Sequence, residues 1–242
     1  AVSGTWTNAT TSASWDAGTG TVTFNSATAG TMTFAGANLA EDEFSSVTFN
    51  STAAGSITFT MATRGLRWAD AGTLTINGTT VLAKATFTLT GGALTIGGTG
   101  VNALTSTSGD VDLDGAVNVS NADSYIDLGS EAWTVTGAWT NSSTSASWDA
   151  GTGTVTLDNT VATTLTFATF TTFEAEFNGL TLNSAASTAI TFTAAGGPLG
   201  FGGTLTLTDS TSTTTLAMAA INIQGDASST IDMTDADGRL TF

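Results

Sequence analysis

The chain has 242 residues, of which 40 % are hydrophobic and only 10 % are charged, and its formal net charge is −16. It contains no histidine and no cysteine, which excludes a histidine general base, a thiolate metal site and a disulfide framework. It has only four basic residues and 20 acidic ones, so it lacks the clustered Lys and Arg that nucleic acids and anionic membranes require. No apolar run is long enough for membrane insertion.

The first elements along the chain are short runs in which apolar residues alternate with Thr, such as 21–24 (TVTF) and 46–49 (SVTF). Alternation with period two predicts strands with one buried face, and the Gly, Asn, Asp and Ser clusters between them predict turns. No segment keeps a period of 3.6, so we expect almost no helix. Similar residues recur about every 25 positions in places, from Val22 to Val47 and from Met32 to Ile57.

Two acidic pairs follow such strands: Glu41 with Glu43, and Glu174 with Glu176. Residues i and i+2 of a strand share a face, so each pair could bind Ca²⁺. The alternative is a solvent-facing rim at a turn. A glycosidase needs one pair in one cleft, which fits poorly with a pair that is copied along the chain.

The segment 109–121 reads GDVDLDGAVNVSN, in which Asp110, Asp112 and Asp114 match the first ligand positions of an EF-hand-type loop. The twelfth position is Asn121 and not the expected Glu, and no amphipathic helix follows. The alternative is a plain strand with its valines and leucine inward and its acids toward solvent. A calcium site therefore remains one of two interpretations here.

The second half of the chain repeats the first. Residues 144–156 are identical to 11–23, and the offset of 133 continues through several later strands. We assign residues 1–135 to the first copy and 136–242 to the second. Short repeats nested in a long one predict an all-β parallel β-solenoid that runs through both copies, because each turn buries its apolar residues only against its neighbours. Two tandem antiparallel β-sandwiches are the alternative.

Two further features return with the repeat. Trp6 and Trp15 reappear as Trp139 and Trp148, which favours a stack in the core or at its edge over a row that binds sugar rings. Asn-x-Ser/Thr sequences predict possible glycosylation at five positions: Asn8, Asn50, Asn77, Asn118 and Asn141.

The stretches 6–8, 17–24, 44–51 and 73–76, with their counterparts in the second copy, resemble a recurrent family of bacterial and archaeal secreted repeat proteins. The repeats of that family read WTN…AGTGTVTF…FNNLTIN…GTLTL, and the resemblance covers most of the chain. It implies a long, adhesin-like or fibre-forming β-helix at the cell surface and carries no catalytic signature.

The chain ends in LTF and begins with AVSGTW, and joined in that order they match the interior WTVTGAW at 133–139. We therefore expect a non-catalytic, secreted structural protein that stacks head to tail with copies of itself into an extracellular filament, sheath or surface layer. No cofactor is expected apart from possible Ca²⁺.

Three other functions remain open from the sequence. A glycan-binding adhesin stalk would bind cell-surface glycans through an exposed aromatic row. A β-helix polysaccharide-degrading enzyme would need acids beside a basic pair, for which Arg64 and Arg67 are the only close candidates. An ice-binding protein would use rows of outward threonines, although Thr is also simply a good strand former.

Overall fold

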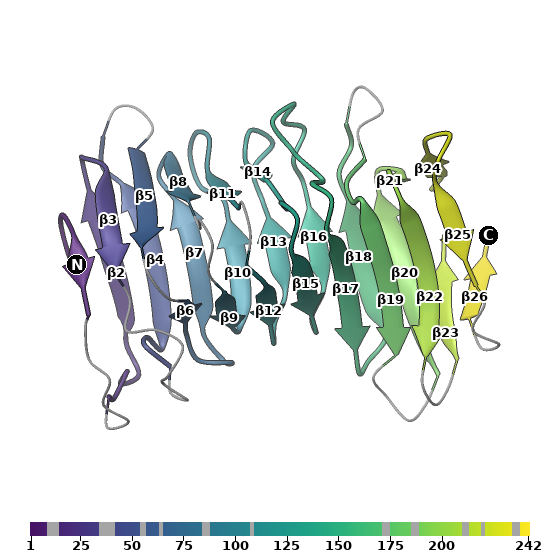
Figure 1. The fold of residues 1–242 in the computed structure, drawn as a ribbon, viewed down its shortest axis with the longest axis horizontal. Coiled ribbons are helices and arrows are strands. Elements are labelled where there is room, and N and C mark those ends of the chain that lie inside the picture. The colour runs from purple at the N-terminus through teal and green to yellow at the C-terminus, as the bar shows by residue number, and fades with distance from the viewer. Residues whose placement is uncertain are drawn as a thin grey trace.

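The computed structural model describes residues 1–8, 15–33, 42–53, 57–62, 65–83, 88–106, 109–170, 175–184, 189–209, 213–218, 221–233 and 238–242. All regular elements in these ranges are strands, stacked along one long axis with the two termini at opposite ends (Figure 1). In the ranges described, no helix has the length and apolar character needed to span a membrane.

The longest sheet has ten strands and runs the length of the molecule. In spatial order its strands are β2 (Thr21–Ser26), β4 (Ser46–Ser51), β7 (Thr73–Asn77), β10 (Ala93–Ile96), β13 (Val117–Val119), β16 (Trp139–Asn141), β18 (Thr163–Phe167), β20 (Ile190–Gly196), β23 (Thr214–Ala217) and β26 (Gly238–Thr241).

Three further sheets form the other faces. The eight-stranded sheet contains β25 (Thr230–Asp232), β22 (Thr204–Asp209), β19 (Gly179–Ser184), β17 (Thr154–Asn159), β15 (Ala132–Val135), β12 (Val111–Leu113), β9 (Leu89–Gly91) and β6 (Leu66–Arg67). The six-stranded sheet contains β1 (Trp6–Thr7), β3 (Gly30–Thr33), β5 (Ile57–Ala62), β8 (Thr80–Ala83), β11 (Ala103–Thr105) and β14 (Tyr125–Ile126), and the two-stranded sheet contains β21 (Leu199–Phe201) and β24 (Ile223–Gly225).

Every strand pairing in the described part of the chain is parallel. Each strand pairs with the strand one turn away and not with its neighbour in sequence, so the predicted parallel β-solenoid is confirmed. Antiparallel sandwiches would instead join consecutive strands by hairpins.

The predicted spacing of 25 residues is confirmed in one place and wrong in another. Val22 pairs with Val47 between β2 and β4. Met32 pairs with Met61 and not with Ile57, so this turn is four residues longer than expected. Alternation could not reveal the error, because a shift by an even number of residues keeps every side chain on the same face.

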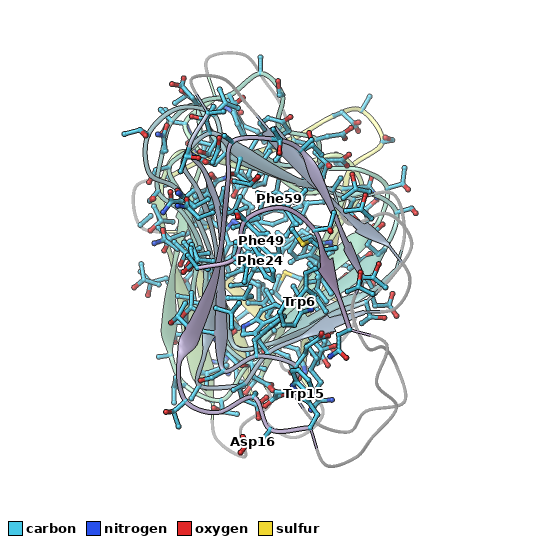
Figure 2. The ribbon with its side chains drawn as sticks, turned by 90° about the vertical axis from the view of Figure 1, so that its left-hand side faces the viewer. Trp6, Trp15, Asp16, Phe24, Phe49 and Phe59 are labelled. Carbon is cyan, nitrogen blue, oxygen red and sulfur yellow. The ribbon has the colours of Figure 1, made fainter. Side chains whose placement is uncertain are left out.

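Apolar side chains from all faces meet in one continuous core that extends from Phe24 to Met218. At the N-terminal end Phe24 stacks on Phe49 with ring centroids 5.0 Å apart, and Phe49 contacts Phe59 at 5.3 Å. Figure 2 shows these three rings inside the enclosure formed by the strands. Full burial of each such ring contributes about 1.5–3 kcal/mol.

The two copies of the repeat lie on different faces of the solenoid. Strands β2 and β4 belong to the ten-stranded sheet, whereas their counterparts β17 and β19 belong to the eight-stranded sheet. One repeat therefore does not contain a whole number of turns. The copies are nevertheless continuous, because β15 of the first copy pairs with β17 of the second.

Candidate functional site

The most elaborate polar arrangement surrounds the buried carboxylate of Glu176. Trp139 Nε1 donates to its Oε1 at 2.6 Å, and Asn141 Nδ2 donates to the same oxygen at 3.0 Å. The backbone N–H of Ala168 donates to Oε2 at 2.8 Å. Trp139 and Asn141 reach one carboxylate because residues two apart on β16 share its inward face.

Trp148 completes what we call the interior cluster, which consists of Trp139, Asn141, Trp148 and Glu176. Its Nε1 donates to the backbone O of Glu176 at 3.0 Å. Its ring meets that of Trp139 edge-on with centroids 6.4 Å apart. The two tryptophans, the amide and the acid therefore form one hydrogen-bonded unit around the turn before β19.

The same unit recurs 133 residues earlier as the N-terminal cluster, made of Trp6, Asn8, Trp15 and Glu43. Trp6 Nε1 donates to Glu43 Oε1 at 3.3 Å, and Asn8 Nδ2 donates to it at 2.9 Å. Trp15 Nε1 donates to the backbone O of Glu43 at 3.0 Å. Figure 2 looks onto the end of the solenoid where Trp6 and Trp15 lie.

These clusters correct the interpretation of the acidic pairs. Glu43 and Glu176 are buried, so a solvent-facing rim is wrong for both. The carboxylate oxygens of Glu176 face hydrogen-bond donors, an arrangement unlike the ring of oxygen ligands around Ca²⁺. Glu41 and Glu174 lie outside the described residues. Within the described ranges, no three potential ligand side chains converge on a metal position.

Burial dominates the electrostatics of the interior cluster. It raises the pKa of Glu176 to about 7, although the hydrogen bonds from Ala168, Asn141 and Trp139 act in the opposite direction. A carboxyl group without water disfavours its charged form, and donors favour it. The protein interior therefore holds the neutral form of this carboxyl group to a much higher pH than water does.

The core interpretation of the repeated tryptophans is confirmed for Trp139 and Trp148, which are buried. Sequence reasoning missed the role of Asn8 and Asn141, which it marked only as possible glycosylation sites. Both side chains are buried, and each Nδ2 donates to a glutamate. A glycan on that nitrogen is incompatible with this folded arrangement. The sequence did contain an indication of this shared role, because both asparagines return at the same offset of 133 residues as the glutamates.

The other three predicted glycosylation positions lie on outward positions of the ten-stranded sheet. Asn50 pairs with Asn77 in register and donates from Nδ2 to Oδ1 of Asn25. These three side chains therefore form an outward ladder across β2, β4 and β7. Asn118 is half-buried in the middle of β13.

The predicted calcium loop is a strand in the structure. In β12, Val111 and Leu113 are buried, whereas Asp110, Asp112 and Asp114 are exposed. This is the plain-strand alternative. Partial burial is the first cause that raises the pKa of Asp114, followed by the nearby carboxylates of Asp70 and Asp112.

Two smaller surface features bear on the enzyme alternative. Arg67 Nε pairs with Asp42 Oδ1 at 3.0 Å on the surface, and Arg64 lies outside the described residues. A surface hollow lies between 196–198 and 221–224, and none of the residues that line it has a titratable side chain. Arg67 therefore has one acid beside it at the surface, and its charge also acts on Asp114, whereas the hollow offers neither an acid nor a base.

The two ends of the solenoid leave strand edges and apolar side chains uncovered. At the C-terminal end Ile231, Met233 and Phe242 are 43 %, 38 % and 88 % exposed. At the N-terminal end Val2 and Val22 are only half-buried against the core. The outer edge of β2 has one partner among the described residues, the isolated bridge from Val2 to Phe24.

Comparison with known proteins adds no relative. No protein-family model matches the chain, and neither the curated proteins nor the solved structures include a match.

Proposed function

We propose that the chain is a structural subunit or segment of an extracellular filament, sheath or surface layer, and that it stacks head to tail with copies of itself. The observation that carries the proposal is the pair of uncovered ends. The sheets stop at β2 and at β25 and β26, and the described residues place no capping element over these strands.

Two physical arguments support stacking. An uncapped parallel solenoid presents backbone N–H and C=O groups that another strand can pair. The three exposed apolar side chains of the C-terminal end add a hydrophobic contribution, since burying them in a neighbour removes them from water. The two ends face opposite ways along the long axis (Figure 1), so their contact does not close on itself and produces a linear assembly.

The extracellular location rests on the resemblance to secreted surface repeat proteins. The core position of Trp139 and Trp148 removes the aromatic row on which a glycan-binding stalk would depend. A structural role is therefore favoured over recognition of sugars.

Electron microscopy and sedimentation velocity of the purified chain test the proposal. The formal charge of −16 opposes association, so both measurements are made over increasing protein concentration and ionic strength. We expect unbranched filaments and a concentration-dependent increase in sedimentation coefficient. Monomers under every condition would overturn the proposal.

A further inference from the structure

The outward face of the ten-stranded sheet carries a column of threonines in register. One outward position of each strand from β2 to β18 pairs with the equivalent position of the next strand, and all but one of these residues are threonine: Thr23, Thr48, Thr75, Thr95, Asn118, Thr140 and Thr166. All of them are half-buried, as expected where side chains of adjacent strands pack side by side. A row of hydroxyl-bearing side chains therefore runs along the long axis of the solenoid (Figure 1).

The neighbouring positions on this face are also small or polar. Two residues before the column, the first strands carry Thr21, Ser46, Thr73 and Ala93. Two residues after it runs the outward asparagine ladder of β2, β4 and β7. Further along the sheet, Thr164 of β18 pairs with Thr193 of β20. Because residues two apart on a strand share a face, these side chains form a two-dimensional array and not a single row.

Charge is absent from the same face. At the described outward positions of this sheet from β2 to β23, no side chain is acidic or basic, although the chain has four basic and 20 acidic residues. The large apolar side chains that are exposed in the described part of the chain also lie outside these strands. The face is therefore neutral, and its chemistry is limited to hydroxyl, amide and methyl groups.

The eight-stranded sheet serves as an internal comparison. It also has an outward column that contains threonines in register, among them Thr134, Thr156 and Thr181. Charged residues interrupt that column at Arg67, Asp112 and Asp232. Strand propensity explains threonine on both sheets, but it does not explain why only one of them lacks charge. The difference points to a ligand of the ten-stranded face that tolerates no charge.

The composition of this face restricts what it binds. A protein partner needs apolar or aromatic side chains at the centre of the contact, and a polysaccharide surface needs aromatic rings on which sugars stack. The described outward positions from β2 to β23 offer neither. A polyanion needs Lys or Arg. Regularly spaced hydroxyl groups with methyl groups between them suit an uncharged, ordered ligand that consists of hydrogen-bonding groups alone, and ordered water is such a ligand.

The spacing of the array is close to that of ice. Adjacent strands place equivalent residues about 4.8 Å apart, and residues two apart on one strand are separated by about 6.7 Å. In a tetrahedral lattice of waters with hydrogen bonds of about 2.75 Å, second neighbours are about 4.5 Å apart and the repeat at right angles is about 7.3 Å. Both spacings of the array are thus within about a tenth of those of the lattice. Threonine is stiff at χ1, so few side-chain positions are left to order when water binds.

We propose that the outward face of the ten-stranded sheet binds ice, through the column from Thr23 to Thr166 and the small residues beside it. Each hydroxyl donates one hydrogen bond and accepts two, so the column holds a row of waters near lattice positions. A charged side chain would orient water around itself and disturb that row, which accounts for the neutrality of the face. Ice binding needs this one face only, so it does not depend on head-to-tail stacking.

The growth of single ice crystals in a solution of the purified chain tests the proposal. The measured quantities are the shape of the crystal and the gap between its melting and freezing temperatures, with serum albumin at equal concentration as the blank. We expect faceted crystals and a gap that widens with protein concentration. Round crystals and no gap beyond the blank at any concentration would overturn the proposal.

Two matched variants assign the activity to a face. Thr75→Lys places a charge in the column of the ten-stranded sheet, and Thr156→Lys places the same charge in the column of the eight-stranded sheet. Both threonines are half-buried at outward positions in the middle of a strand, and each follows another threonine by two residues. We expect Thr75→Lys to lose most of the temperature gap and Thr156→Lys to keep it. Thr95→Lys should behave like Thr75→Lys and replaces it if circular dichroism shows that Thr75→Lys alters the fold.

The remaining outcomes are distinguishable. Equal gaps for Thr75→Lys and Thr156→Lys with unchanged circular dichroism, whether kept or lost, would contradict the assignment to this face. Sedimentation velocity of the same samples detects lateral contact with a second copy. Association that Thr75→Lys abolishes, in a protein that does not shape ice, would overturn ice binding and assign the face to a protein contact. Filaments seen by electron microscopy bear on the stacking proposal alone.

Discussion

The interior and N-terminal clusters make the same hydrogen bonds with the same four residue types, yet they differ in burial. Trp139 and Trp148 are buried, whereas Trp6 and Trp15 are half-buried. The difference follows from the strands beside each cluster: β13 places Val117 next to Trp139, whereas among the described residues β1, which contains Trp6, pairs only with β3. The repeated residues therefore determine the hydrogen bonds of each cluster, and the position of the copy along the solenoid determines how deeply the cluster is buried.

Removal of the glutamate should give the largest difference in stability between the two clusters. Glu176→Ala leaves three buried donors without an acceptor, and we expect it to lower the free energy of unfolding by about 3 kcal/mol. Glu43→Ala should cost about 1–2 kcal/mol, since water reaches the end of the solenoid. Urea unfolding followed by circular dichroism measures both, with the exposed Asp112→Ala as a control near zero. An equal or larger loss of stability for Glu43→Ala would contradict the expected difference between the two clusters.

The pKa of Glu176 predicts a pH dependence. Because burial raises it from 4.5 to about 7, the folded chain keeps a proton that the unfolded chain releases between these values. The contribution is fully present below about pH 4.5 and is lost as pH rises through 7, by up to about 3 kcal/mol. Wild type and Glu176→Gln, compared by unfolding at several pH values, should differ in slope across this window. Parallel curves would show that Glu176 does not titrate there.

The tryptophan donors should give a smaller contrast. Trp139→Phe keeps a large apolar ring but removes the N–H that donates to Glu176, and we expect a loss of about 2 kcal/mol. Trp6→Phe should cost about 1 kcal/mol in the monomer, because its bond to Glu43 is longer and partly exposed. Thermal or chemical unfolding of both variants at low protein concentration decides this. A larger loss of stability for Trp6→Phe than for Trp139→Phe would contradict this prediction.

The smallest contrast concerns the outward asparagines of equivalent strands. Asn183 donates to the carboxylate of Asp158, whereas Asn50 donates to the amide oxygen of Asn25. A charged acceptor forms the stronger bond, so Asn183→Ala should cost about 1 kcal/mol and Asn50→Ala about half of that. The same unfolding experiment measures both, and the difference should shrink when Asp158 is also replaced by Asn.

The sequence predicted the solenoid because alternation and the long repeat both report which face of a strand is buried. It did not predict that Met32 pairs with Met61, since alternation is blind to even shifts. Nor did it show that the copies lie on different faces, because the number of turns in a repeat depends on loop lengths that carry no periodic signal.

The acids show a different limit. A carboxylate beside a turn, such as Glu176, has the same local sequence whether it faces water or is buried among donors. Its partners Trp139 and Asn141 lie more than thirty residues away in sequence and meet it only through the stacking of turns. The shared offset of all four cluster residues was the available signal, and it became readable once the fold was known.

Hydrogen exchange of the equivalent strands β2 and β17 tests the central claim most directly. In dilute protein we expect the amides of Thr21–Ser26 to exchange faster than those of Thr154–Asn159, because among the described residues only Val2 pairs with the outer edge of β2. In concentrated, assembled protein a second copy covers that edge, and the difference should disappear. Equal protection in dilute protein, or a difference that persists in the assembly, would contradict the account.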